Sequence, residues 1–136
     1  MIASEKVDGQ PTILIVEDDD WLRVVVADIL ESSGYRVATA NNGKQANDYL
    51  ATAGEPPAAI LMDLMMPIQN GWDFLLGLKG EARFAATPIV VMTGLGRDLP
   101  AGVDLVLKKP FCLDDLVETI AHFAQVNRRI DEPNLR

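Results

Sequence analysis

The stretch Ala58-Ala59-Ile60-Leu61-Met62-Asp63-Leu64-Met65-Met66-Pro67 decides the fold of this chain. Five apolar residues in a row end in one carboxylate, Asp63, without the alternation that a half-exposed strand shows. A run of this kind is typical of a strand buried on both faces of a parallel sheet. A helix does not fit, because Pro56-Pro57 and Pro67 leave too few residues between them. An aspartate at the carboxyl end of such a strand stands where open α/β sheets bind ligands, although an aspartate that only caps a turn is also common.

Four further segments have the composition of strands, and they alternate with segments that repeat apolar residues at helical spacing. The strand-like segments are residues 12–16, 36–40, 88–93 and 103–109. The helical stripes are Leu22, Val25, Val26 and Ile29; Ala46, Tyr49, Leu50 and Ala53; Trp72, Leu75, Leu76 and Leu78; and Leu113, Leu116, Val117, Ile120 and Ala124. This alternation predicts an α/β fold with a doubly wound, five-stranded parallel sheet and helices on both faces.

Polar residues stand where four of the predicted strands end. They are Glu17 and Asp18 after the first strand, then Asp63, Thr93 and Lys109. The carboxyl ends of parallel strands share one edge of the sheet, so we expect these side chains to meet there. Crowded carboxylates share protons or hold a cation, and a few hard oxygen ligands suit Mg²⁺ or Mn²⁺. With a lysine beside it and a hydroxyl donor nearby, Asp63 is suited to accept a phosphoryl group.

The composition sets limits on function and location. The chain has 136 residues, and 12 Lys and Arg stand against 20 Asp and Glu, which gives a net charge of −8. That charge argues against binding to nucleic-acid phosphates. No apolar run has membrane-spanning length and no signal-peptide core is present, so we predict no membrane insertion and a cytoplasmic location. We expect a flexible tail over residues 1–11, one domain over 12–127, and a C-terminal tail over 128–136.

Taken together and in order, four motifs resemble the receiver domain of bacterial two-component response regulators. They are Ile13-Leu14-Ile15-Val16-Glu17-Asp18-Asp19-Asp20, Ile60-Leu61-Met62-Asp63-Leu64-Met65-Met66-Pro67 with Asn70-Gly71, Pro88-Ile89-Val90-Val91-Met92-Thr93-Gly94, and Lys109-Pro110-Phe111. The resemblance covers about residues 11–127 and implies a CheY-like, flavodoxin-like sheet with strand order 2-1-3-4-5. It implies that Asp63 accepts a phosphoryl group from a histidine kinase or a histidine phosphotransfer protein, and that the signal passes to a further, unidentified protein.

The resemblance also implies roles at the edge of the sheet. Asp18 would bind Mg²⁺ directly and Glu17 largely through water, while Asp63 and the backbone carbonyl of Met65 would complete the protein's ligands. Lys109 would pair with the phosphoryl group, Thr93 would donate a hydrogen bond to it, and the Lys109–Pro110 peptide bond would be cis.

The sequence departs from this family at two places. Residues 94–102 are about two helical turns too short for the fourth helix of most receivers, and their glycines and Pro100 disfavour a helix. We therefore predict that the fourth helix is short or absent. Val106 stands where the family usually has Tyr or Phe, a ring that moves together with the hydroxyl residue. The usual readout through that ring is missing, and we expect movement of Thr93 to pass into residues 94–102.

Three other functions compete with that of a single-domain response regulator, which is not an enzyme beyond its own phosphorylation and dephosphorylation. An aspartyl-nucleophile phosphatase of the haloacid dehalogenase type would have a second Asp where this chain has Met65. A flavodoxin-like flavin carrier would bind phosphate after the first strand, where the four acids at 17–20 would repel it. A degenerate receiver that binds partners without phosphorylation does not require the complete set of acids, Thr93 and Lys109. The chain ends near residue 136, so we expect no output domain.

Overall fold

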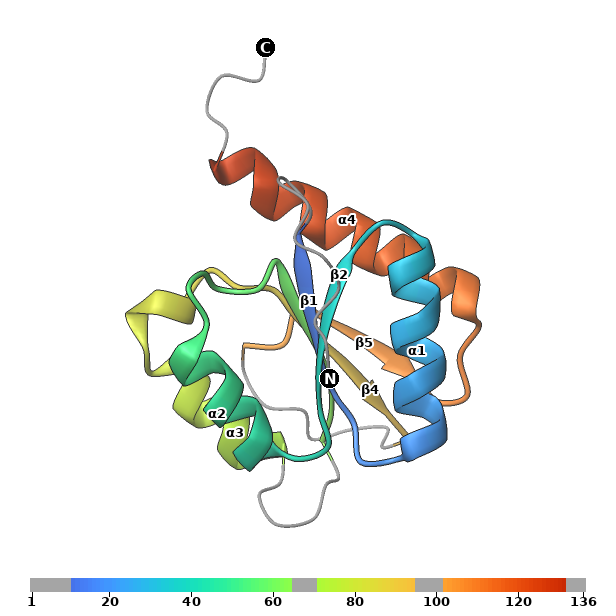
Figure 1. The fold of residues 1–136 in the computed structure, drawn as a ribbon, viewed down its shortest axis with the longest axis horizontal. Coiled ribbons are helices and arrows are strands. Elements are labelled where there is room, and N and C mark those ends of the chain that lie inside the picture. The colour runs from blue at the N-terminus through green and yellow to red at the C-terminus, as the bar shows by residue number, and fades with distance from the viewer. Residues whose placement is uncertain (1–10, 65–70, 95–101, 132–136) are drawn as a thin grey trace.

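The computed structural model describes residues 11–64, 71–94 and 102–131, and it shows a sheet with helices packed on both faces (Figure 1). The elements are β1 (Thr12–Val16), α1 (Asp20–Ser32), β2 (Arg36–Ala40), α2 (Gly43–Thr52), β3 (Ala59–Asp63), α3 (Gly71–Lys79), the 3₁₀ helix η1 (Ala82–Phe84), β4 (Ile89–Thr93), β5 (Leu105–Lys108) and α4 (Leu113–Asp131). Helices α1 and α4 cover one face of the sheet, and α2 and α3 cover the other (Figure 1).

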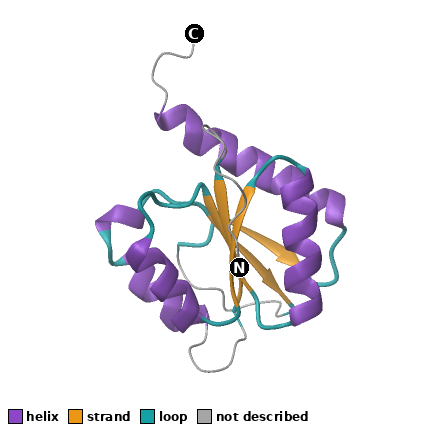
Figure 2. Cartoon of the chain, viewed as in Figure 1, coloured by secondary structure: helices purple, strands orange, loops and turns teal. Residues whose placement is uncertain are grey.

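The five strands are all parallel and lie in the order β2-β1-β3-β4-β5. Figure 2 shows the strands lying between the helices of the two faces. The predicted doubly wound sheet and its strand order are therefore confirmed. The chain moves outward from β1 to β2, and then in the opposite direction from β1 through β3 to β5. The place where this direction reverses, between β1 and β3, is where such sheets form a crevice at the carboxyl ends of their strands.

Each central strand contributes side chains to two separate cores, which explains why its sequence does not alternate. In β3, Ile60 and Met62 belong to the core under α2 and α3, whereas Ala59 and Leu61 belong to the core under α1 and α4. These four side chains and Asp63 are all buried. A strand covered by helices on both faces has no solvent-facing side on which polar residues would be favoured.

The face that helix α3 presents to the core agrees with the prediction at Trp72, Leu75 and Leu78 and differs from it at Leu76. Leu76 was expected to point inward, but its side chain is 71% exposed. Phe74, which was not among the predicted core residues, is fully buried. The buried positions of α3 are Gly71, Phe74, Leu75 and Leu78. Their spacing places Leu76 on the opposite side of the helix.

Two segments near the C-terminus also bear on the predicted boundaries. Helix α4 continues to Asp131, so residues 128–131, which were expected to begin a tail, are helical. Between β4 and β5, the described residues Gly94 and 102–104 contain no helix. This agrees with the prediction that the helix between the fourth and fifth strands is short or absent, and the helix labelled α4 is the one that follows β5. Residues 95–101 lie outside the described part, as do residues 1–10 of the N-terminal tail that was expected over residues 1–11. Within the described residues, no helix has the length and apolar character needed to cross a membrane.

Candidate functional site

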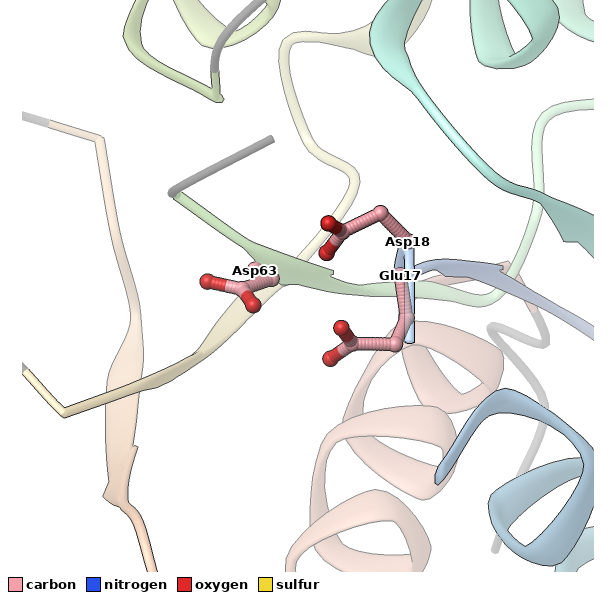
Figure 3. Close-up of side chains that lie close together, drawn as sticks. All are labelled: Glu17, Asp18 and Asp63. Carbon is pink, nitrogen blue, oxygen red and sulfur yellow. The ribbon is translucent and has the colours of Figure 1, made fainter. Parts of the chain in front are cut away.

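Three acidic side chains meet at the carboxyl edge of the sheet, where the direction of the strand order reverses between β1 and β3. One carboxylate oxygen from each of Glu17, Asp18 and Asp63 lies within 4.8 Å of the others. Figure 3 shows the three carboxylates directed toward a common space. The parallel register that pairs Val16 of β1 with Met62 of β3 places the residues that follow them, Glu17 and Asp63, side by side. The predicted cluster of acids is therefore present.

Lys109 pairs with two of these acids. Its Nζ donates to Oδ2 of Asp63 at 2.9 Å and to Oε1 of Glu17 at 3.2 Å. Its backbone N–H donates to the carbonyl of Thr93 at 2.8 Å, which ties the chain beyond β5 to the end of β4. The Lys109–Pro110 peptide bond is cis, as predicted. Pairing with Asp63 was predicted, whereas the second contact, to Glu17, was not.

Burial gives the site unusual electrostatics. Removal from water is the largest cause that raises the pKa of Glu17, from its ordinary 4.5 to about 7. The charge of Asp63 acts in the same direction, whereas the amide of Asp19 and the Lys109 ammonium oppose it. For Lys109, burial lowers the pKa, but hydrogen bonds and charges from Asp63 and Glu17 outweigh this effect and raise it. The site thus carries more negative charge than its one lysine balances, a situation that a bound cation relieves.

The raised pKa of Glu17 predicts a pH dependence of stability in the absence of divalent metal. The folded state binds the proton of Glu17 more tightly than the unfolded state does. The contribution of this proton to the free energy of unfolding is therefore complete below pH 4.5 and is lost as pH rises through about 7. Relative to Glu17→Gln, the wild-type free energy of unfolding should fall by up to about 1.4 kcal/mol per pH unit within this window. Urea unfolding in a chelating buffer measures it. Parallel profiles for the two proteins would contradict the expected ionisation.

The other predicted site residues are placed as follows. Thr93 is fully buried at the end of β4, and the register that pairs Asp63 with Met92 sets it one residue beyond Asp63 along the edge of the sheet. Its hydroxyl's role toward a phosphoryl group stays a prediction. Val106 is half-buried and packs against the core under α2 and α3. Met65, predicted to offer its carbonyl to the metal, lies outside the described residues.

The four acids that follow β1 have four different roles, which their sequence alone did not separate. Oε2 of Glu17 accepts from the backbone N–H of Asp19 at 3.0 Å, and Oδ1 of Asp19 accepts from the N–H of Leu22 at 3.0 Å, as the N-cap of α1. Asp20 pairs with Arg23. Only Asp18 has a carboxylate for which the described residues provide no hydrogen-bond donor. The N-cap role of Asp19 was not predicted, although an aspartate just before an apolar stripe of helical spacing is the sequence pattern that indicates it.

Gly71 allows the start of α3 to approach the segment that follows Asp63. A Cβ at Gly71 would lie 2.5 Å from Cα of Leu64 and 2.9 Å from the carbonyl oxygen of Asp63. The N–H of Gly71 donates to the carbonyl of Leu64 at 2.8 Å. The glycine is therefore required for this contact, and it joins α3 to the end of the strand that carries Asp63.

Gly71→Ala is accordingly expected to lower the free energy of unfolding by about 2 kcal/mol, since backbone atoms must shift to admit the methyl group. Gly77→Ala in the same helix is the matched control, because a Cβ there meets nothing within 4 Å. It should stabilise the protein by about 0.5–1 kcal/mol through the helix propensity of alanine. Urea unfolding of both variants measures these changes. Equal effects of the same sign would show that the close approach at Gly71 does not matter.

Comparison with known proteins places this geometry in context. The family model for the response regulator receiver domain matches residues 13–121. The response regulator Rre1 of Synechocystis sp. is 37% identical over 77% of this chain and 48% of its own length. The transcriptional regulatory protein CpxR of Escherichia coli is 35% identical over 79% of this chain and 47% of its own length. The chain thus spans about half the length of these two relatives.

Among solved structures, the receiver domain of the sensor histidine kinase PA1611 from Pseudomonas aeruginosa is similar with a TM-score of 0.78 and 28% identity. The match covers 86% of this chain and 99% of that one. The PA1611 receiver domain has a magnesium ion coordinated in its active-site cleft.

Proposed function

Because this chain belongs to the family of response regulator receiver domains, we propose that it is a phosphorylation switch whose phospho-acceptor is Asp63. The observation that carries the proposal is the position of Asp63, which the Lys109 ammonium contacts at 2.9 Å within a cluster of three carboxylates. The phosphodonor is a histidine kinase or a histidine phosphotransfer protein, and the phosphorylated form signals by binding a further protein. Direct binding to nucleic acid and insertion into a membrane form no part of this function.

The reaction requires no general base, because Asp63 attacks as a carboxylate. One of its oxygens forms a bond to the phosphorus while the bond from phosphorus to the imidazole nitrogen of the donor breaks. The imidazole leaves with the electron pair and takes up a proton. Lys109, already beside Asp63, pairs with an oxygen of the transferred group, and Thr93 donates a hydrogen bond to another. These charges act where negative charge is spread over the phosphoryl oxygens.

The acids of the site are suited to Mg²⁺ or Mn²⁺. Asp18 and Asp63 would bind the ion directly and Glu17 largely through water, with the carbonyl of Met65 as a further ligand. Three carboxylates whose oxygens lie within 4.8 Å of one another, two of them paired with Lys109, fit a small, hard divalent cation. When bound, the cation draws the oxygens of the phosphoryl group toward Asp63 and offsets their charge. We propose that the functional unit is residues 12–127, that it acts as a single domain, and that it catalyses nothing beyond its own phosphorylation and dephosphorylation.

The proposal is tested by incubating the full chain with Mg²⁺ and acetyl phosphate and then measuring its intact mass. The mass should rise by one phosphoryl group, and the rise should disappear when EDTA replaces Mg²⁺. No rise with Mg²⁺ would favour the alternative of a degenerate receiver that binds partners without phosphorylation. Continuous release of phosphate from unrelated monoesters would favour the phosphatase alternative. The cytoplasmic location stays a prediction.

A further inference from the structure

Arg23, in the first part of α1, turns its guanidinium back toward the end of β1. Its Nη1 donates to the backbone carbonyl of Glu17 at 2.9 Å, and its Nη2 pairs with Oδ1 of Asp20 at 2.6 Å. The side chain of Arg23 is 18% exposed, whereas that of Asp20 is 85% exposed. The carbonyl that Arg23 contacts belongs to the peptide group that joins Glu17 to Asp18. Arg23 therefore holds the backbone next to Asp18, which is the exposed acid of the cluster.

The stability of α1 does not account for this placement. The positive charge of Arg23 lies near the N-terminus of the helix, where the helix dipole disfavours a cation. Its ion pair with Asp20 is largely exposed on the aspartate side, and exposed pairs contribute little. The remaining contact, with the carbonyl of Glu17, is the better protected one. It is a charge-assisted hydrogen bond, which is stronger than a neutral one and fixes the direction of the carbonyl.

The backbone on either side of Asp18 is fixed by separate contacts. The N–H of Glu17 donates to the carbonyl of Ala40 at 3.0 Å, and the N–H of Asp19 donates to the carboxylate of Glu17 at 3.0 Å. The carbonyl of Glu17 is held by Arg23 alone among the hydrogen bonds of the described residues that involve side chains. The carboxylate of Asp18 has no hydrogen-bond donor of its own among these residues, so its position follows from the peptide groups around it.

We propose that Arg23 is a positioning residue for Asp18: by holding the carbonyl of Glu17, it sets the orientation of the Glu17–Asp18 peptide and presents the Asp18 carboxylate to a divalent cation. This inference rests on the proposed function, in which the acidic cluster binds Mg²⁺. Groups that orient a metal ligand without touching the metal commonly contribute about 10- to 100-fold to affinity.

The direction in which removal of Arg23 changes the Kd for Mg²⁺ distinguishes a positioning role from a purely electrostatic one. Arg23 is a positive charge close to a cation site, so if it acted only through its charge, its removal would tighten Mg²⁺ binding. If it positions Asp18, its removal weakens binding even though the site becomes more negative. A purely structural role makes a third prediction, which is that the melting temperature falls equally with and without Mg²⁺.

The experiment compares four variants of the full chain with the wild type: Arg23→Met, Arg23→Lys, Asp20→Asn and Lys44→Met. Lys44→Met is the matched control, because Lys44 also pairs with an acid on its own helix, at 3.4 Å, but on the exposed surface of α2. For each protein, isothermal titration calorimetry gives the Kd for Mg²⁺, and thermal unfolding gives the rise in Tm that Mg²⁺ produces.

Arg23→Met should raise the Kd for Mg²⁺ about 10-fold and reduce the Mg²⁺-dependent rise in Tm. Arg23→Lys should recover part of the affinity, since an ammonium can also donate to the carbonyl, leaving a Kd about 3-fold above wild type. Asp20→Asn and Lys44→Met should stay within about 2-fold. Should Arg23→Met fail to fold, the Kd of Arg23→Lys decides.

An unchanged or lower Kd in the arginine variants, with a wild type that binds Mg²⁺ and takes up phosphate, overturns the positioning role and leaves the proposed function intact. A wild type that binds no Mg²⁺ overturns both.

Discussion

Asp63→Asn is expected to reduce phosphorylation of the chain by acetyl phosphate in Mg²⁺ to below detection. An amide is neither charged nor nucleophilic at neutral pH, and the substitution also removes the charge that Lys109 contacts at 2.9 Å. The other two acids of the cluster remain, so binding of the donor alone would still be possible. Intact mass spectrometry after a fixed incubation measures the phosphorylated fraction.

Asp48→Asn is the control for this substitution. It makes the same chemical change at an exposed aspartate of α2, whose carboxylate pairs with Lys44 on the surface, away from the acidic cluster. It should leave the phosphorylated fraction unchanged. Phosphorylation that persists in Asp63→Asn at the wild-type level would show that another residue accepts the group.

Asp18→Asn should raise the Kd for Mg²⁺ by about 100-fold, since it removes a charged ligand rather than a group that only orients one. The rate of phosphorylation at limiting Mg²⁺ should fall with it. The fold should survive, and the melting temperature without metal should stay equal or rise, because removing one of three neighbouring negative charges relieves their repulsion. Calorimetric titration with Mg²⁺ and thermal unfolding in a chelating buffer measure these effects.

The neighbouring residue provides a stringent control for Asp18. Asp19→Asn removes the same charge one position further along, and asparagine caps a helix as well as aspartate does. Its Kd for Mg²⁺ should stay within about 3-fold of wild type, as expected for a charge that is close but not a ligand. Similar losses in the two variants would mean that Asp18 acts only through local charge and is not a ligand.

Much of the fold could be predicted because the strands are buried on both faces. In such strands the apolar run itself gives the length and the end of the strand, and the end of β3 falls at Asp63 as expected. Helix α3 shows the limit of the same reasoning. It has Phe74, Leu75, Leu76 and Leu78 within five positions, so its apolar pattern does not select one face. Contact with the sheet selects it, and Leu76 is left exposed.

The candidate site was predictable where it depends on which side chains end the strands, and not where it depends on the backbone. The convergence of Glu17, Asp18 and Asp63 follows from the topology of a parallel sheet. The contact of Arg23 could not be predicted, because its acceptor is a backbone carbonyl that no residue type marks. The end of α4 was predicted too early because Arg128, Arg129 and Asp131 are charged residues typical of a polar tail. The helix-ending signal in the sequence is Pro133, and the observed end of the helix at Asp131 lies just before it.

The central claim, that Asp63 receives the phosphoryl group, is tested most directly by locating the modification. The wild-type chain is phosphorylated in Mg²⁺, treated with borohydride, which reduces an acyl phosphate to an alcohol, and then digested and sequenced by tandem mass spectrometry. We predict that Asp63, and neither Glu17 nor Asp18, is converted to homoserine, and that the conversion is absent without acetyl phosphate. Reduction at any other acid, with Asp63 intact, would contradict the account.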